Sequence, residues 1–72
     1  MYTIYSKDSC QQCDAAKLLC TMRGVEFEVK ELDKDFSREE LLSLSPNARS
    51  FPVVFKDGEL IGGLEQLKNS LK

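Results

Sequence analysis

Two adjoining segments decide the fold of this chain: Tyr2-Thr3-Ile4-Tyr5 and, after a polar turn, Cys10-Gln11-Gln12-Cys13. The first segment is rich in β-branched and aromatic residues, which predicts a strand. Apolar residues then recur at helical spacing from Gln11 to Arg23, and Gly24 stands where a helix commonly ends. The sequence therefore places two cysteines, three residues apart, between the end of a strand and the first turn of a helix.

The next segments predict a second strand and a second helix. Val25-Glu26-Phe27-Glu28-Val29 alternates apolar and charged residues, which is typical of a strand. Ser37-Arg38-Glu39-Glu40 has the pattern of a capping box, in which a hydroxyl and a carboxylate each satisfy a free backbone N–H. The helix that it opens runs over residues 41–44, and we expect it to stop before Pro46.

The last third of the chain predicts a hairpin and a short helix. Pro52-Val53-Val54-Phe55 is typical of a third strand. Asp57-Gly58 is a two-residue hairpin turn that leads into a fourth strand, Glu59-Leu60-Ile61. After Gly62-Gly63, leucines at helical spacing predict a final helix.

The resulting order of elements, β-α-β-α-β-β-α, places the chain in the α/β class. We expect the first two strands to pair in parallel through a right-handed crossover, and the last two to form an antiparallel hairpin. These pairings predict a four-stranded mixed sheet flanked by helices on both faces. No linker or repeat interrupts residues 1–72, so we expect a single domain.

Composition excludes several classes of protein. The 72 residues carry a formal net charge of −2 without a basic cluster, which argues against nucleic-acid binding. No apolar run approaches the ~20 residues that span a bilayer, and the N-terminus lacks the pattern of a secretory signal. We therefore expect a cytoplasmic monomer with no membrane or nucleic-acid partner.

The position of the two cysteines points to redox chemistry. The first turn of a helix has free N–H groups and a partial positive charge, which stabilise a thiolate and lower its pKa. Lys7 adds a positive charge three residues before Cys10. Cys10 should be the more exposed sulfur and the attacking thiol. Cys13, one turn into the helix, is then the resolving thiol that displaces a mixed disulfide.

Other roles for these cysteines are less favoured. Structural zinc takes four ligands, usually Cys and His, and this chain has no His and three Cys, so we predict no metal site. A purely structural disulfide across so short a loop would remove little unfolded-state entropy. Cys20 lies about 10 Å along the helix from Cys13, too far for a disulfide. We interpret Cys20 as core filling, with a regulatory thiol as the alternative.

Two further segments have both a structural and a functional interpretation. Phe51-Pro52 can simply open a strand, since proline is tolerated at the first position. A cis peptide there would instead direct the backbone of Phe51 toward a substrate sulfur, free to pair with an extended peptide. Gly62-Gly63-Leu64-Glu65 can be a tight turn with an acidic residue complementing the helix dipole. Alternatively, its free N–H groups hold a carboxylate while Glu65 meets an ammonium group.

With these segments together, the chain resembles the glutaredoxins over essentially its whole length. The resemblance implies a thioredoxin fold and an oxidoreductase that reduces protein disulfides or glutathione mixed disulfides. Glutathione is then the co-substrate, with no tightly bound cofactor, and the active centre is a redox-active disulfide used in electron transport. The segments that carry the resemblance are Ile4-Tyr5-Ser6-Lys7, Cys10-Gln11-Gln12-Cys13, Phe51-Pro52-Val53 and Ile61-Gly62-Gly63-Leu64-Glu65.

The resemblance also implies roles for individual residues. Cys10 corresponds to the nucleophile, and Lys7 to a lysine near the glycine carboxylate of glutathione. Pro52 corresponds to a cis proline, and Phe51 to the residue whose backbone pairs with the glutathione cysteine. The segment Leu64-Glu65 corresponds to the one that binds the γ-glutamyl end. The candidate substrate-binding residues are therefore Lys7, Gln12, Phe51, Pro52, Gly63, Leu64 and Glu65.

Departures from the family pattern leave two alternatives open. Many glutaredoxins have Pro-Tyr where this chain has Gln11-Gln12, and Asp where it has Glu65. Gln12 and Pro52-Val53-Val54 also resemble NrdH-type redoxins, which are recharged by thioredoxin reductase and donate electrons to ribonucleotide reductase. Their usual Trp-Ser-Gly-Phe-Arg segment is absent here, which favours glutathione. The alternative of another class is a module that carries an iron–sulfur cluster.

Overall fold

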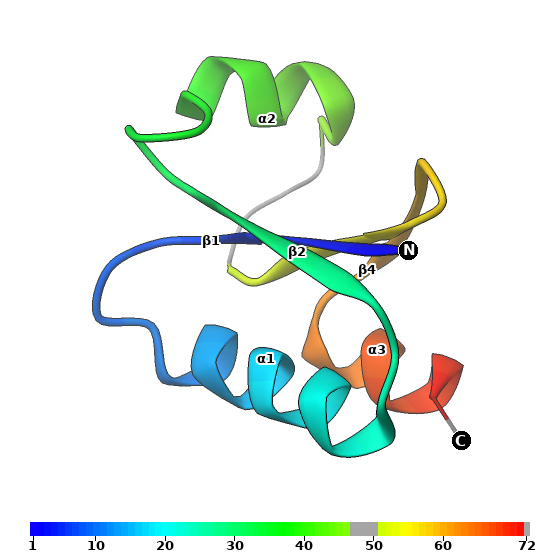
Figure 1. The fold of residues 1–72 in the computed structure, drawn as a ribbon. Helices are drawn as coiled ribbons and strands as arrows, with labels where there is room; N and C mark the ends of the chain where they lie inside the picture. Colours follow the sequence, from blue (N-terminus) through cyan, green and yellow to red (C-terminus); the bar gives the residue numbers. More distant parts are fainter. Residues whose placement is uncertain (47–50, 72) are drawn as a thin grey trace.

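The computed structural model describes residues 1–46 and 51–71 of the chain (Figure 1). The order β-α-β-α-β-β-α predicted from the sequence is confirmed. The elements are β1 (Tyr2–Ser6), α1 (Gln11–Arg23), β2 (Phe27–Glu31), α2 (Arg38–Leu44), β3 (Val53–Lys56), β4 (Glu59–Gly62) and α3 (Leu64–Ser70).

The four strands form one mixed sheet in the order β2-β1-β3-β4. β1 pairs in parallel with β2 and antiparallel with β3, and β3 pairs antiparallel with β4 through the Asp57-Gly58 turn. Both turn residues have positive φ, 51° and 86°, as a tight hairpin turn requires. β1 is therefore an inner strand, and its C-terminal end leads directly to the cysteine pair.

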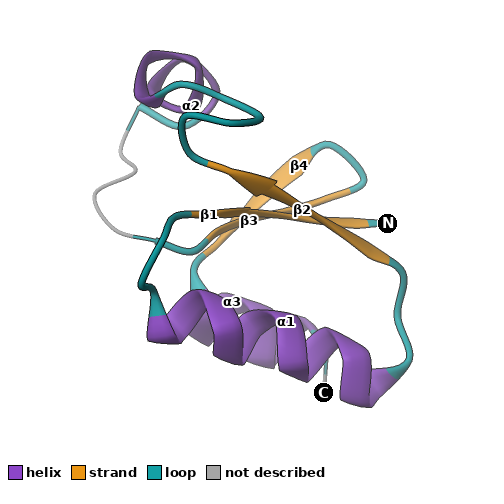
Figure 2. Cartoon of the chain, turned by 60° about the vertical axis from the view of Figure 1, so that its left-hand side comes forward, coloured by secondary structure: helices purple, strands orange, loops and turns teal. Residues whose placement is uncertain are grey.

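Helices cover both faces of the sheet, as expected (Figure 2). α1 and α3 lie side by side on one face, and α2 lies on the other. Because side chains alternate along a strand, neighbouring residues of β1 serve opposite faces: Ile4 faces α1, whereas Tyr5 belongs to the cluster under α2. This arrangement is the thioredoxin fold.

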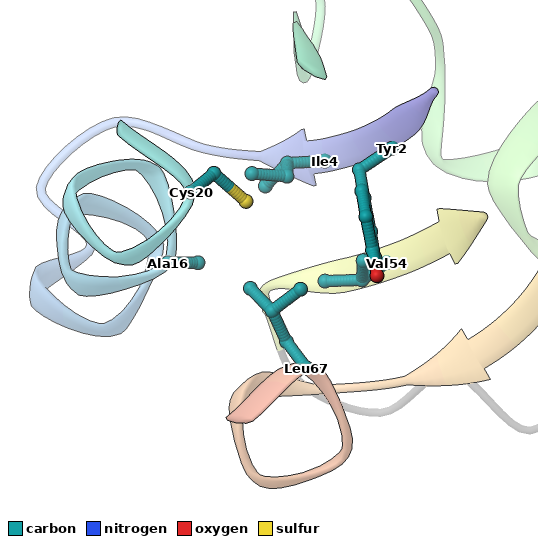
Figure 3. Packing of buried hydrophobic residues seen from close by; sticks show 6 residues of the cluster. All are labelled: Tyr2, Ile4, Ala16, Cys20, Val54 and Leu67. Carbon is teal, nitrogen blue, oxygen red and sulfur yellow. The ribbon is translucent and has the colours of Figure 1, made fainter. Parts of the chain in front are cut away.

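The two faces have separate hydrophobic cores. The core between the sheet and the α1–α3 layer, which we call the first cluster, is shown in Figure 3. Its buried members are Tyr2, Ile4, Ala16, Cys20, Val54 and Leu67. The second cluster, on the α2 face, consists of Tyr5, Phe36, Leu41, Val53 and Phe55.

The helix boundaries agree with the sequence prediction. α1 ends in a Schellman motif: Gly24, with φ of 69°, donates to the carbonyl of Thr21, and the N–H of Val25 donates to that of Cys20. At α2 the capping box is present, with the Glu40 N–H 3.1 Å from Ser37 Oγ and the Ser37 N–H 3.3 Å from Glu40 Oε1.

The strand boundaries differ from prediction by one or two residues. β2 runs over Phe27–Glu31, and not over residues 25–29, because the Val25 N–H is used by the helix cap and cannot join the ladder. β1 extends to Ser6, β3 starts after the proline at Val53, and β4 extends to Gly62. No helix in the described part of the chain is long and apolar enough to cross a membrane.

Candidate active site

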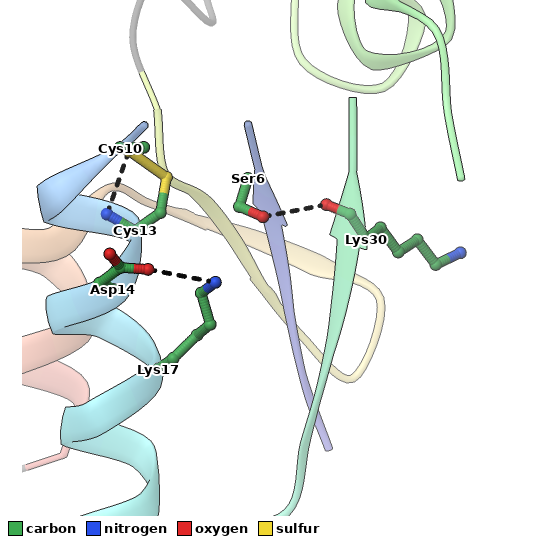
Figure 4. The surroundings of a disulfide bond; sticks show 6 residues. All are labelled: Ser6, Cys10, Cys13, Asp14, Lys17 and Lys30. Carbon is green, nitrogen blue, oxygen red and sulfur yellow. Dashed lines mark hydrogen bonds and ion pairs between the residues drawn. A yellow bond between two sulfur atoms is a disulfide. The ribbon is translucent and has the colours of Figure 1, made fainter. Parts of the chain in front are cut away.

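Cys10 lies at the N-terminal end of α1, directly after the loop that follows β1. It is the N-cap residue, with an extended backbone, and its Sγ accepts a hydrogen bond from the Cys13 N–H at 3.1 Å (Figure 4). Ser9, immediately before it, has φ of 56°, a left-handed conformation that few residues other than glycine adopt. The loop thus turns sharply to direct the sulfur at the free N–H groups of the first helical turn, which favour an anion.

Cys10 and Cys13 form a disulfide in this structure. Their Cα atoms are 5.2 Å apart, well within the distance that a disulfide spans. Cys10 is half-buried, whereas Cys13 has no exposed surface, so the exposure order expected from the sequence is confirmed. A thiolate or disulfide arriving from solvent therefore meets Cys10 first.

Polar contacts beside the disulfide fix its neighbours. The Asp14 carboxylate, in the first turn of α1, forms an ion pair with Lys17 Nζ at 3.3 Å, one turn further along the same helix (Figure 4). The Ser6 hydroxyl, fully buried at the end of β1, donates to the carbonyl of Lys30 on β2 at 3.4 Å. The second contact holds the C-terminal ends of β1 and β2 together just before the chain turns toward the site.

Cys20 takes no part in the disulfide. It is fully buried in the first cluster beside Ile4 and Leu67, as Figure 3 shows, and burial raises the pKa of its thiol. The interpretation of Cys20 as core filling is confirmed.

Phe51-Pro52 brings the start of β3 to the site. The peptide bond between the two residues is cis, and Pro52 is buried. The first residue before α3, Gly63, lies against Pro52: a Cβ built on Gly63 would be 3.4 Å from the Pro52 carbonyl oxygen. Two segments that the sequence analysis assigned to the site separately therefore lie next to each other, at a separation that a side-chain carbon at position 63 would fill.

Lys7 and Phe51 also meet. The Lys7 Nζ lies 5.8 Å from the centroid of the Phe51 ring, in the range of a cation–π contact. The same ring is 6.3 Å from that of Phe36, a buried member of the second cluster. The cluster under α2 therefore extends to the rim of the site.

Three other predicted residues are placed without such contacts. Leu64 is half-buried and packs against the first cluster, so its side chain is part of the core. Gln12 and Glu65 are exposed, in the first turns of α1 and α3, and within residues 1–46 and 51–71 their side chains make no hydrogen bond or ion pair.

Gln66 is a residue of this region that the sequence analysis missed. Its Oε1 accepts the Gly63 N–H at 2.9 Å, so one of the amides expected to be free is already bonded. A Cβ at Gly62, whose φ is 122°, would lie 2.7 Å from Gln66 Cγ, which explains why glycine stands there. The available signal was the glutamine three residues after Gly63, the spacing of a capping box.

Comparison with known proteins decides the family. Residues 2–61, which include the Cys10–Cys13 disulfide at the start of α1, match the family model for glutaredoxin. The chain belongs to the glutaredoxin family. It is thus a thiol–disulfide oxidoreductase, and the Cys10–Cys13 disulfide is the oxidised form of its dithiol.

Individual glutaredoxins agree with this assignment. Glutaredoxin 3 of Escherichia coli (strain K12) is 31% identical over 64 residues, which cover 89% of this chain and 77% of that protein. A probable glutaredoxin of Synechocystis sp. (strain ATCC 27184 / PCC 6803 / Kazusa) is 34% identical over 65 residues, covering 89% of this chain and 74% of that one. The structure of a buckwheat glutaredoxin–glutathione complex superposes with a TM-score of 0.81 at 27% identity, covering 96% of this chain and 66% of that one.

The described residues also bear on metal binding. Within residues 1–46 and 51–71, no group of three or more His, Cys, Asp or Glu side chains is arranged to hold a metal ion.

Proposed function

We propose that this glutaredoxin reduces protein disulfides and glutathione mixed disulfides, with Cys10 as nucleophile, Cys13 as resolving thiol and glutathione as co-substrate. The observation that carries the proposal is the position of half-buried Cys10 at the start of α1, with its Sγ 3.1 Å from the Cys13 backbone nitrogen and beside the fully buried Cys13. The amide that contacts Cys10 Sγ in the disulfide is placed to stabilise the thiolate once the bond is reduced.

Reduction of a protein disulfide takes two exchanges. The Cys10 thiolate attacks one substrate sulfur, forms a mixed disulfide with it and releases the other substrate sulfur as a thiolate. The Cys13 thiolate then attacks Cys10 Sγ, forms the Cys10–Cys13 disulfide and releases the second substrate thiolate. Two electrons pass from the dithiol to the substrate, which takes up two protons as its thiolates equilibrate with water.

Glutathione reverses this state in two further exchanges. A glutathione thiolate attacks the exposed sulfur, Cys10 Sγ, and Cys13 leaves as a thiolate. A second glutathione thiolate attacks the glutathione sulfur of the mixed disulfide, so glutathione disulfide departs and Cys10 is again a thiolate. The two glutathione molecules supply the two electrons.

The segments around the sulfurs are suited to hold glutathione. We assign the ammonium of Lys7 to its glycine carboxylate, the backbone of Phe51 beside Pro52 to its cysteine, and Leu64-Glu65, which follow Gly63, to its γ-glutamyl end. Gln12, exposed in the first turn of α1, completes the rim. The contacts of Lys7 with Phe51 and of Gly63 with Pro52 support a single site, and the similar buckwheat protein was solved as a glutathione complex.

The same dithiol could draw electrons from thioredoxin reductase and pass them to ribonucleotide reductase, so the electron source needs a direct test. NADPH consumption with a disulfide substrate is compared with glutathione plus glutathione reductase and with thioredoxin reductase alone. We expect turnover with the first system. Turnover with thioredoxin reductase alone would overturn the glutathione proposal.

Dependence on glutathione fits a reducing compartment, and we place the protein in the cytoplasm.

Cysteine variants test the division of labour. We expect Cys10→Ser to reduce turnover to the background of uncatalysed thiol exchange, because the exposed nucleophile is lost. Cys13→Ser should still accept one glutathionyl group on Cys10 from a mixed disulfide, detected by mass spectrometry, but should not reduce protein disulfides through an intramolecular step. Cys20→Ala is the matched control, since Cys20 is buried away from the pair. Full activity of Cys10→Ser would disprove the assignment.

A further inference from the structure

We infer that the ring of Phe51 is a positioning group for Lys7, holding its ammonium at the rim of the site to meet the glycine carboxylate of glutathione. The inference rests on the proposed function and adds a role for a side chain whose backbone alone was assigned there. It is carried by three observations: the strand pairing, the cation–π contact and the aromatic residues behind the ring.

The pairing of β1 with β3 brings Lys7 and Phe51 to the same end of the sheet. β1 pairs with β3 antiparallel, and the last pair is Tyr5 with Val53. Lys7 directly follows β1 and Phe51 precedes β3 by two residues, so both lie just beyond the same end of this strand pair. Phe51 packs against the second cluster, which includes Tyr5 and Val53, so its ring lies on the α2 face of the sheet. The contact of Lys7 with Phe51 at 5.8 Å thus lies at the end of the central strand pair, where the two segments are already close.

Buried aromatic residues back the Phe51 ring. Phe51 is half-buried and lies 6.3 Å from Phe36, which packs edge-to-face on Tyr5 with ring centroids 4.9 Å apart. Phe36 and Tyr5 are 6% and 8% exposed and belong to the second cluster. The Phe51 ring therefore packs against the buried cluster, and the Lys7 ammonium lies over the ring.

This arrangement addresses a specific weakness of lysine as an anion-binding group. The side chain of Lys7 is exposed, and a lysine stem has many rotamers that must be restricted when its ammonium binds an anion. A ring that attracts the ammonium before the substrate arrives removes part of that entropic cost. The benefit applies to a ligand that carries the carboxylate and not to one from which the charge has been removed.

That distinction provides the experiment. The rate constant for reduction of the Cys10–Cys13 disulfide is measured with glutathione and with its monoethyl ester, in which the glycine carboxylate is esterified. Acid quenching followed by chromatographic separation of the oxidised and reduced protein follows the reaction without a coupling enzyme. The ratio of the two rate constants reports the carboxylate alone, since an effect on the sulfurs or on folding changes both rates together.

We expect Phe51→Leu to lower this ratio about two- to fivefold, the size of an exposed cation–π contact, while Phe51→Tyr retains it. Lys7→Gln should bring the ratio near one, and Phe51→Leu should then have no further effect on it. Lys56→Gln is the matched control, because Lys56 makes a similar contact with Tyr2, 5.6 Å from the ring, at the opposite end of β1 and β3.

An unchanged ratio in Phe51→Leu, or equal further loss in the Lys7→Gln background, would overturn the inference. Should Phe51→Leu fail to fold, the wild-type protein still decides: the Lys7 εCH₂ protons should show an upfield ring-current shift by NMR, and its absence counts against the contact. If glutathione fails to reduce the wild-type disulfide at all, the proposed function itself fails, which is a distinct result.

Discussion

The two faces of the sheet are packed differently. On the α1–α3 face, α1 alone contributes three buried residues, Cys13, Ala16 and Cys20, and none of them has any exposed surface. On the other face α2 contributes one buried residue, Leu41, while Leu42 and Leu44 in the same short helix stay exposed. The fully buried members of the first cluster are Ile4, Ala16, Cys20, Val54 and Leu67, whereas every member of the second retains 4–8% exposure.

This difference matches the tasks that we assign to the two faces. The cysteines sit on α1, whose first turn must hold Cys10 Sγ and the Cys13 N–H in one geometry through cycles of oxidation and reduction. A close-packed layer provides that rigidity. Phe51 and Lys7 lie at the edge of the aromatic face, where a ligand comes and goes. The chemistry thus rests on the tightly packed face, and the part of recognition that we assign to Lys7 and Phe51 rests on the more loosely covered one.

The largest effect that tests this comparison is the loss of a buried leucine from each face. We expect Leu67→Ala to lower the free energy of unfolding by about 3–5 kcal/mol, because a closed cavity would form between α3, α1 and the sheet. Leu41→Ala should cost about 2 kcal/mol, since the singly anchored α2 can settle into part of the space. Urea denaturation of both variants measures the difference. Equal losses would show that the two faces are equally rigid.

Much of the fold could be predicted because local signals coincide with the observed ends of the elements. The cysteine-containing helix ends at Arg23 because Gly24 adopts a left-handed conformation that suits glycine, and α2 begins after Ser37 because its capping box forms. The second strand begins two residues later than predicted. The alternation from Val25 to Val29 carries no information on hydrogen bonds, and the Val25 N–H is bonded in the helix cap. Local pattern therefore predicted the type of element better than its edge.

The candidate site divides in the same way. The cysteine pair could be found from sequence because spacing and position on a helix suffice to define it. The contacts among Lys7, Phe36 and Phe51 could not, because they depend on the register of β1 with β3 and on the loop before α2. Gln66 lies three residues after the cap position, as in a capping box. The pattern was missed because the cap residue is Gly63, which has no side chain to form the other half of the box.

A smaller effect is expected from the cap of the loosely packed helix. Ser37→Ala should lower the free energy of unfolding by about 1 kcal/mol, because it leaves the Glu40 N–H without its partner while α2 has little burial to compensate. Ser43→Ala is the matched control, since Ser43 is exposed within the same helix. Thermal melts of the two variants suffice. If they coincide, α2 is held by packing more than by its cap, and the contrast between the faces weakens.

The smallest effect concerns a contact that belongs to neither face. The amino group of Met1 pairs with the Asp57 carboxylate in the β3–β4 turn, and the pair holds the pKa of Asp57 below its ordinary value. A carboxyl group whose pKa is lowered by folding stabilises the folded protein. The contribution is fully present at pH values above the ordinary pKa of the group, 3.8, and is lost as the pH falls through the folded-state pKa.

Asp57→Asn isolates the charge, because asparagine also tolerates the positive φ of 51° at this position. We expect a slightly lower melting temperature than wild type at pH 7, and we expect this difference to disappear as the pH falls through the lowered pKa of the folded-state carboxyl. The gap at pH 7 should shrink in high salt, since the pair is exposed. A gap that persists in acid would mean that Asp57 acts through the shape of the turn and not through its charge. Because this contact lies outside both hydrophobic clusters, the small effect of Asp57→Asn on stability is a reference for the larger effects of Leu67→Ala and Leu41→Ala.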